Sequence, residues 1–262
     1  MFELDVYGSG LAVALMIAVA AWLVSIPKRD VSFVDSLWSL FFLAMMLTYL
    51  LQAPSVVERA YVVLFLVTVW AVRLSVFITL RDWGGPEDRR YQQIRADNEP
   101  RFWVKSLYIV FGLQAVLAWI ISLPLLGVVL GATPLGWLDL AATALWLIGF
   151  GFESIGDQQL ASFKAAPSNR GRVLDQGLWR YTRHPNYFGE ACIWWAFYLF
   201  ALSAGAWWSI VGPVVVTFLL LRVSGVALLE KDIGERRPAY RDYIERTNAF
   251  FPGPPKKRSS TD

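Results

Sequence analysis

Long apolar runs, separated by shorter polar segments, occupy most of the chain. A run of about 20 apolar residues is long enough to cross the hydrocarbon core of a membrane as a helix. The pattern predicts an all-α, polytopic integral membrane protein with about seven transmembrane helices, which cover residues 8–26, 32–51, 59–80, 103–130, 135–152, 187–204 and 207–229. Pro124 removes a backbone donor inside the fourth run, so we expect that helix to kink or to end early.

The basic residues are distributed unevenly among the segments that flank these runs. Segments 27–31, 81–105, 153–186 and 222–262 together hold 22 of the 24 lysine and arginine residues. Because basic residues gather on the cytoplasmic side of a membrane, the alternation predicts an N-terminus outside and a C-terminus in the cytoplasm. The last three of these segments are long, which predicts a polar cytoplasmic cap.

Composition agrees with a membrane protein and narrows the partners. The chain is 56% hydrophobic and 17% charged, whereas an average soluble domain is about 25% charged. The net charge of +3 fits membrane topology and attraction to anionic lipids better than nucleic-acid binding. One cysteine and one histidine leave no set of ligands for a His/Cys metal centre. We therefore expect membrane lipids as partners, with no nucleic acid and no metal. We also expect a monomer.

The stretch RYTRHPNYFGE, residues 180–190, lies where the sixth run begins. Pro185 suits the first turn of a helix, whose N-terminal end carries a partial positive charge. Arg183 and His184, just before it, could bind an anion there, or could instead anchor phospholipid headgroups. Three polar residues that follow share one helix face by their spacing: Asn186, Tyr187 and Glu190.

Further charged residues lie on the same predicted side of the membrane. Asp157 follows Glu153 by one helical turn, and the next segment carries three basic residues, Lys164, Arg170 and Arg172. Alone they are typical of a solvated basic loop, but next to Arg183 they predict a phosphate-binding surface. Arg222 and Glu230 fall on roughly one face at the inner end of the seventh run.

Polar residues also lie deep in the first half of the chain, where they are costly in hydrocarbon. Asp35 lies early in the second run, Arg73 within the third and Gln114 within the fourth. Asp35 and Arg73 could form a structural ion pair. Alternatively, they belong to a polar cluster that binds and protonates a substrate carbonyl, with Tyr91 as a further candidate acid.

The motif RHPNYFGE resembles the signatures of the integral-membrane sterol reductases and the steroid 5-alpha-reductases. Residues 150–260 resemble the bacterial branch related to the latter family. The resemblance implies a bacterial inner-membrane protein that takes NADPH from the cytoplasmic side. Residues 1–130 would form a four-helix half with the substrate cavity, and 131–262 a three-helix cofactor half, within one integrated membrane domain.

The resemblance also implies a reaction and a set of residues. The reaction is reduction of a C=C bond conjugated to a carbonyl in a hydrophobic substrate, of the 3-oxo-Δ4-steroid 5-alpha-reductase type. The proton would come from a membrane-embedded acid, for which Asp35, Arg73 and Tyr91 are the catalytic candidates. The implied cofactor contacts are Asp157, Arg172, Tyr181, Arg183, His184, Asn186, Tyr187, Glu190, Arg222, Glu230 and Lys231. Lys164, from the basic segment described above, completes the predicted cofactor-binding set.

Two other functions remain open on the sequence. Isoprenylcysteine and phospholipid methyltransferases carry a similar RHPxYxG motif, which in them binds S-adenosylmethionine. Asn186 and Glu190 resemble the reductases more closely. A lipid-binding membrane protein without enzyme activity is the third possibility, although it gives Glu190 no role.

Overall fold

The computed structural model describes residues 2–223, 225–226, 230 and 239–256, and these form helices and loops without a β-strand. The chain divides into two compact units. The first contains Met1–Asp139 and Phe200–Gly212, and the second contains Leu140–Leu199 and Pro213–Asp262. The first unit therefore includes 131–139 and 200–212, which the sequence assigned to the cofactor half.

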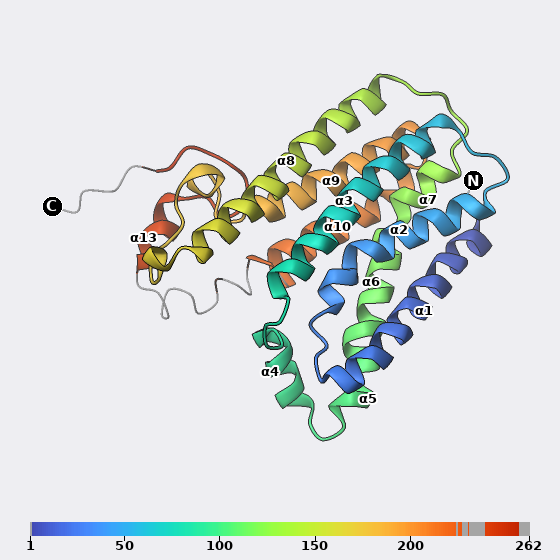
Figure 1. Cartoon of the computed structure of the whole chain (residues 1–262). Helices are drawn as coiled ribbons and strands as arrows, with labels where there is room; N and C mark the ends of the chain where they lie inside the picture. The colour runs from blue at the N-terminus through green and yellow to red at the C-terminus, as the bar shows by residue number, and fades with distance from the viewer. Residues whose placement is uncertain (1, 224, 227–229, 231–238, 257–262) are drawn as a thin grey trace. The chain divides into compact units, whose positions relative to one another are not determined.

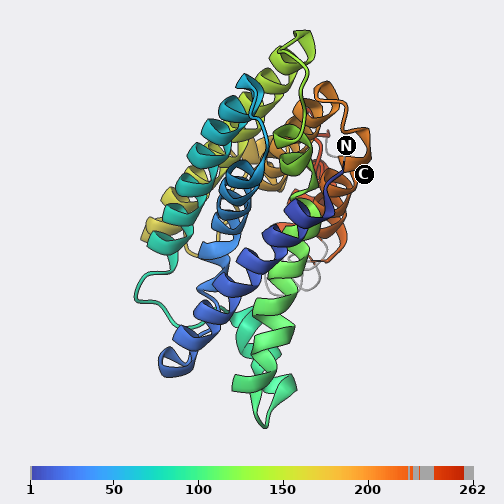
Figure 2. The same ribbon diagram turned by 90° about the vertical axis from the view of Figure 1, so that its right-hand side faces the viewer.

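The first unit is built on three long helices, α1 (Leu4–Lys28), α2 (Val34–Gln52) and α3 (Glu58–Asp82) (Figure 1). Helix α2 packs between α1 and α3, and α1 also runs alongside a fourth, segmented helix (Figure 2). The segmented helix consists of α5 (Phe102–Ser106), the π-helical turn η1 (Leu107–Gly112) and α6 (Leu113–Ile121). It is preceded by α4 (Arg89–Asn98) and followed by α7 (Leu123–Val129), and η4 (Trp207–Ile210) packs against α7.

The predicted fourth span is interrupted near its proline. Helix α6 ends at Ile121, and α7 starts directly after Ser122 with Pro124 in its first turn. A proline there has no intrahelical donor to lose, because the first N–H groups of a helix are unpaired in any case. The prediction that this helix kinks or ends early is confirmed.

Among the described residues, five helices are long and apolar enough to cross a membrane: Leu4–Lys28, Val34–Gln52, Glu58–Asp82, Phe102–Ile121 and Trp137–Ala165. They correspond to the first five predicted runs and indicate an integral membrane protein. The sixth run forms helix α9 (Pro185–Ser203), which is not one of the five because its first turns hold polar residues such as Asn186 and Glu190.

The seventh run forms η4, α10 (Val211–Phe218) and the π-helical turn η5 (Leu219–Val223). Together, residues 207–223 make an apolar helix shorter than a full span, and most of 224–229 lie outside the described residues. The count of seven spans and the orientation of the chain in the membrane stay predictions.

A buried arginine at the start of α3 binds residues 133–139 and Ser203 within the first unit. Arg59 is only 1% exposed, and its guanidinium binds both carboxylate oxygens of Asp139, at 2.6 and 3.0 Å. The remaining donors reach the Thr133 and Pro134 carbonyls and the Ser203 hydroxyl. Because every charged group has its partners, this buried pair escapes the cost of an uncompensated charge.

The second unit contains most of α8 (Trp137–Ala165) and α9, with the short helices η2 (Pro167–Asn169), η3 (Gly177–Arg180) and α13 (Ala239–Arg246). The backbones of helices α8 and α9 lie in contact at two glycines, Gly149 and Gly189. A Cβ atom on Gly189 would lie 2.5 Å from the Gly149 carbonyl oxygen and 2.5 Å from the Glu153 amide nitrogen. Small residues allow helices to pack this closely within a membrane.

We predict that Gly189→Ala destabilises the protein, because the added methyl group would collide with rigid backbone rather than with a movable side chain. Overpacking of this kind costs about 1–3 kcal/mol. The thermal midpoint in detergent should therefore fall clearly below that of the wild type. Gly151→Ala on α8 is the matched control, since a Cβ atom there meets nothing within 4 Å. Equal midpoints for the two variants would contradict the close crossing.

Candidate functional site

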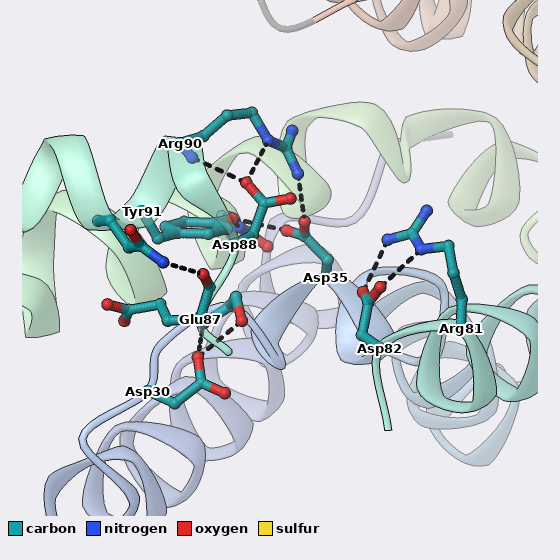
Figure 3. Close-up of polar contacts among 11 residues, drawn as sticks. Asp30, Asp35, Arg81, Asp82, Glu87, Asp88, Arg90 and Tyr91 are labelled. Carbon is teal, nitrogen blue, oxygen red and sulfur yellow. Dashed lines mark hydrogen bonds and ion pairs between the residues drawn. The ribbon is translucent and has the colours of Figure 1, made fainter. Parts of the chain in front are cut away.

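Asp35 and Tyr91, two of the predicted catalytic residues, are hydrogen-bonded to each other in the first unit. Asp35 lies in the first turn of α2, and Tyr91 lies in α4, outside the candidate spans. The Tyr91 hydroxyl donates to Asp35 Oδ1 at 2.6 Å, and Arg90 Nη2 donates to Oδ2 at 2.9 Å (Figure 3). Both carboxylate oxygens thus have a donor at the edge of an apolar helix.

Gln114 of α6 extends this pair into a chain of hydrogen bonds. Its side-chain nitrogen donates to the Tyr91 hydroxyl at 2.9 Å, which leaves that hydroxyl proton for Asp35. The amide oxygen of Gln114 is buried and has no hydrogen-bond partner in the part of the chain that the structure describes. We call Asp35, Arg90, Tyr91 and Gln114 the acid cluster. Its one open acceptor could receive a donor group from a ligand or a water molecule.

Asp88 sets the position of Arg90 and Tyr91. As the N-cap of α4, its carboxylate accepts from the Arg90 backbone N–H at 2.8 Å and from Arg90 Nε at 3.0 Å. Burial alone would raise the Asp88 pKa, but these bonds and the Arg90 charge outweigh it and hold the pKa below its ordinary value. Asp88 therefore stays ionised while it starts the helix and directs the guanidinium toward Asp35.

Helix α4 is also tied to the loop after α1 through Glu87. The Val31 backbone N–H donates to Glu87 Oε1 at 2.9 Å, and Arg95 binds both oxygens of the same carboxylate (Figure 3 labels Glu87). Arg95 also reaches the Arg29 carbonyl. These contacts hold the segment that carries Tyr91 against the start of α2.

Burial raises the pKa of Tyr91, and the neighbouring negative charge of Asp35 and their hydrogen bond raise it further. The Tyr91 side chain lies outside the membrane spans but is only 8% exposed. At neutral pH its hydroxyl therefore keeps its proton and acts as a hydrogen-bond donor. A neutral phenol next to a carboxyl group is suited to stabilise negative charge that develops on a substrate oxygen.

Arg73, the third predicted catalytic residue, is not part of the acid cluster. Its guanidinium lies over the Phe77 ring, 5.2 Å from the ring centroid. The alternative prediction of an Asp35–Arg73 ion pair is wrong, because the basic partner of Asp35 is Arg90. Proline and aspartate in PEDRRY indicate the start of a helix at Asp88, but this local signal does not identify Asp35 as the partner of Arg90.

In the second unit, Arg183 and His184 bind Glu230. Arg183 Nε and Nη2 each lie 2.7 Å from a Glu230 oxygen, and His184 Nε2 lies 2.9 Å from Oε1. Arg183 Nη1 also donates to the Ile244 and Thr247 carbonyls. Both predicted anion ligands are buried and tie the start of α9 to the C-terminal segment. We call these residues the Glu230 cluster.

The other predicted cofactor residues fall into two groups. Some are engaged inside the second unit: Asn186 Nδ2 donates to Asp157 Oδ1 at 3.2 Å, and the Tyr187 ring stacks on His184 with centroids 5.4 Å apart. Glu190 is half-buried on α9. The exposed members are Lys164, Arg172, Tyr181 and Arg222. Lys231 lies outside the described residues.

The Glu230 cluster predicts a pH dependence of stability. Burial alone would raise the Glu230 pKa, but the hydrogen bonds from His184 and Arg183 outweigh it and lower the pKa from 4.5 to about 2. A carboxylate with a depressed folded-state pKa stabilises the fold above its unfolded value and loses that contribution as the pH falls. We therefore predict that the thermal midpoint of the wild type declines as the pH is lowered from 4.5 toward about 2.

Glu230→Gln should lower the midpoint at neutral pH and remove this part of the acid dependence, because Gln cannot titrate. Glu245→Gln, at an exposed position in α13, is the control and should follow the wild type. The prediction fails if the Glu230→Gln and wild-type profiles remain parallel through the acid range.

Comparison with known proteins adds a family. A protein-family model described as "Protein of unknown function (DUF1295)" matches residues 21–247. The "Uncharacterized protein C594.04c" of Schizosaccharomyces pombe is 27% identical in an alignment 281 residues long. The alignment covers 93% of this chain and 78% of the yeast protein. No solved structure matches the chain.

Proposed function

The chain belongs to the DUF1295 family, and on that premise we propose that it is an NADPH-dependent membrane reductase. Its substrate would be a hydrophobic, steroid-like molecule in which a C=C bond is conjugated to a carbonyl. The observation that carries this proposal is the acid cluster, in which Tyr91 and Asp35 share a hydrogen bond at the end of an apolar helix. The resemblance of residues 180–190 to the sterol and steroid reductases supports the choice of reaction.

The side chains of the second unit fit a dinucleotide in their chemistry. Lys164, Arg172 and Arg222 are exposed cations that can bind phosphate oxygens. Asn186 and Asp157 supply amide and carboxylate groups near the N-terminus of α9, which suit the hydroxyl and amide groups of a nucleotide. Arg183 and His184 act differently in this proposal, since Glu230 holds them as supports for the start of α9.

The acid cluster would handle the proton of the reaction. The hydride for the double bond would come from the bound cofactor, and the substrate oxygen would then gain negative charge. Tyr91 would turn its hydroxyl proton from the Asp35 carboxylate to that oxygen. One proton relayed through the Tyr91–Asp35 pair would then reach the carbon next to the carbonyl, which completes the addition of H⁻ and H⁺ across the C=C bond. The partly exposed Arg90 and Asp88 adjoin Asp35, so water at this edge can return the proton.

The acid cluster favours a reductase over a methyltransferase that uses S-adenosylmethionine. Methyl transfer to a thiol or an oxygen nucleophile releases a proton and requires a base. Tyr91 instead keeps its hydroxyl proton at neutral pH, because burial and Asp35 raise its pKa. Enone reduction consumes a proton, so it requires a proton donor such as Tyr91. A lipid-binding protein without enzyme activity would leave this costly polar cluster without a role.

We predict that Tyr91→Phe and Asp35→Asn each lower turnover of 3-oxo-Δ4 steroids by about 10²-fold to 10⁴-fold, the usual contribution of a positioned acid. Consumption of NADPH in detergent or nanodiscs measures the rate. NADPH affinity should stay unchanged, because the proposed cofactor contacts lie in the second unit. Asp35 and Tyr91 belong to the first unit, and their proposed role is proton transfer. The controls are Tyr108→Phe, an exposed tyrosine, and Asp82→Asn, whose carboxylate pairs with Arg81 at the surface. Normal turnover in the Asp35 and Tyr91 variants would overturn their proposed roles.

We further predict saturable quenching of tryptophan fluorescence by NADPH in the purified protein. Asn186→Ala should weaken this binding about tenfold, as expected for the loss of one or two polar contacts. Asn98→Ala at the end of α4 in the first unit is the control and should bind normally. Saturation by S-adenosylmethionine and not by NADPH would instead assign the methyltransferase function. Binding of neither would contradict both enzymatic proposals.

A further inference from the structure

A second candidate site lies in the first unit, at the end of α1. There the C-terminal turn of α1 lies near α4 and α5 (Figure 1). Residues of these three helices and of the loop after α1 line a pocket of about 300 Å³. Its lining includes Ser25, Arg29, Arg95, Glu99, Phe102 and Trp103. None of these residues belongs to the acid cluster or to the predicted cofactor set, so the proposed reaction leaves the pocket without a role.

The pocket lies at the level of the membrane–water boundary. The span Leu4–Lys28 ends at its rim, and the span Phe102–Ile121 begins there. Trp103 is 55% exposed, and its carbonyl accepts a 2.7 Å hydrogen bond from the Trp22 indole, which joins α5 to α1. Tryptophan favours this boundary in membrane proteins. Phe102 and Trp103 therefore mark the apolar side of the pocket, whereas Arg95 and Glu99 lie on the water side, outside the spans.

Arg95 is held in place by groups around the pocket. Its Nε and Nη2 bind the Glu87 carboxylate at 2.9 and 2.7 Å, and its guanidinium lies 4.5 Å from the centroid of the Phe102 ring. Arg95 is thus largely neutralised by Glu87. It fixes one wall of the pocket and keeps the ring of Phe102 beneath it.

Arg29 and Glu99 supply one charge of each sign. Both are exposed, and neither side chain makes a hydrogen bond or ion pair with another side chain among the residues that the structure describes. Of the charged residues that line the pocket, Arg95 is paired with Glu87, which leaves Arg29 and Glu99 as the cation and the anion without an ion-pair partner among the described residues. A pocket with one available cation, one available anion and an apolar side matches a zwitterionic ligand better than a polyanion.

We propose that this pocket binds the headgroup of a zwitterionic phospholipid with a primary ammonium group, such as phosphatidylethanolamine. Arg29 would bind the phosphate and Glu99 the ammonium, while the exposed Trp103 would contact the start of the acyl chains. Phosphatidylcholine offers no N–H donor to Glu99, and phosphatidylglycerol offers no positive charge, so both should bind less tightly. The proposal does not depend on the proposed reductase function.

The test is native mass spectrometry of the full chain in detergent, titrated with phosphatidylethanolamine, phosphatidylcholine and phosphatidylglycerol of identical acyl chains. We expect phosphatidylethanolamine to bind about tenfold more tightly than the other two. Glycerophosphoethanolamine, which has the same headgroup without acyl chains, distinguishes a lipid from a soluble phosphate ligand. It should compete only at far higher concentration.

Two variants separate the two charges. Arg29→Asn keeps a residue that tolerates the left-handed backbone of this helix end (φ 52°) and should weaken binding of all three lipids about tenfold. Glu99→Gln preserves size and should remove only the preference for phosphatidylethanolamine. Arg101→Asn is the matched control, since Arg101 is exposed, has a similar backbone (φ 71°) and does not line the pocket.

Three results would overturn the assignment. These are equal affinity of the wild type for the three lipids, equal losses in Arg29→Asn and Arg101→Asn, or an unchanged lipid preference in Glu99→Gln. Competition by glycerophosphoethanolamine as strong as that of the lipid would assign the pocket to a soluble ligand instead. Unchanged thermal midpoints in the variants would show that these outcomes report on the pocket rather than on folding.

Discussion

A carboxylate at the end of a membrane helix must be compensated, and the compensation of Asp35 organises much of the first unit. Its two oxygens take donors from Tyr91 and Arg90, which both come from a short helix outside the spans. Asp88 starts that helix and orients Arg90, while Glu87 ties it to the loop after α1. The connection between α3 and α5 is therefore a polar segment that side-chain hydrogen bonds hold in place. In the proposed reaction, this element would supply the proton.

The same constraint acts in the second unit with a different outcome. Glu230 holds Arg183 and His184 so completely that these residues serve the packing of the C-terminal segment against α9. Lys164 and Arg172, by contrast, are exposed. A motif that resembles a cofactor signature can thus combine residues that support the site with residues that contact a ligand. In the RHPNYFGE stretch, Arg183 and His184 are of the first kind, and Asn186 is proposed as one of the second.

The sequence predicted what depends on local pattern and missed what depends on long-range pairing. Run lengths predicted the five long apolar helices, and Pro124 predicted the break between α6 and α7. Asp35 and Tyr91 were named as acids, but nothing local indicates that Arg90, 55 residues away, would pair with Asp35 instead of Arg73. The bond between Arg183 and Glu230 spans 47 residues, so a solvent-facing anion site was the natural expectation for Arg183. A partner contributed by a distant loop leaves no periodic signal in the chain.

The central claim is that Asp35 and Tyr91 act as one proton-donating unit in an NADPH-dependent reduction. A double-mutant cycle on turnover of a 3-oxo-Δ4 steroid tests it most directly, with Asp35→Asn, Tyr91→Phe and the double variant compared at saturating NADPH. If the two residues share one step, the double variant should be about as slow as the slower single variant. Multiplicative losses would show that they act independently, and full activity in the double variant would remove the acid cluster from the reaction.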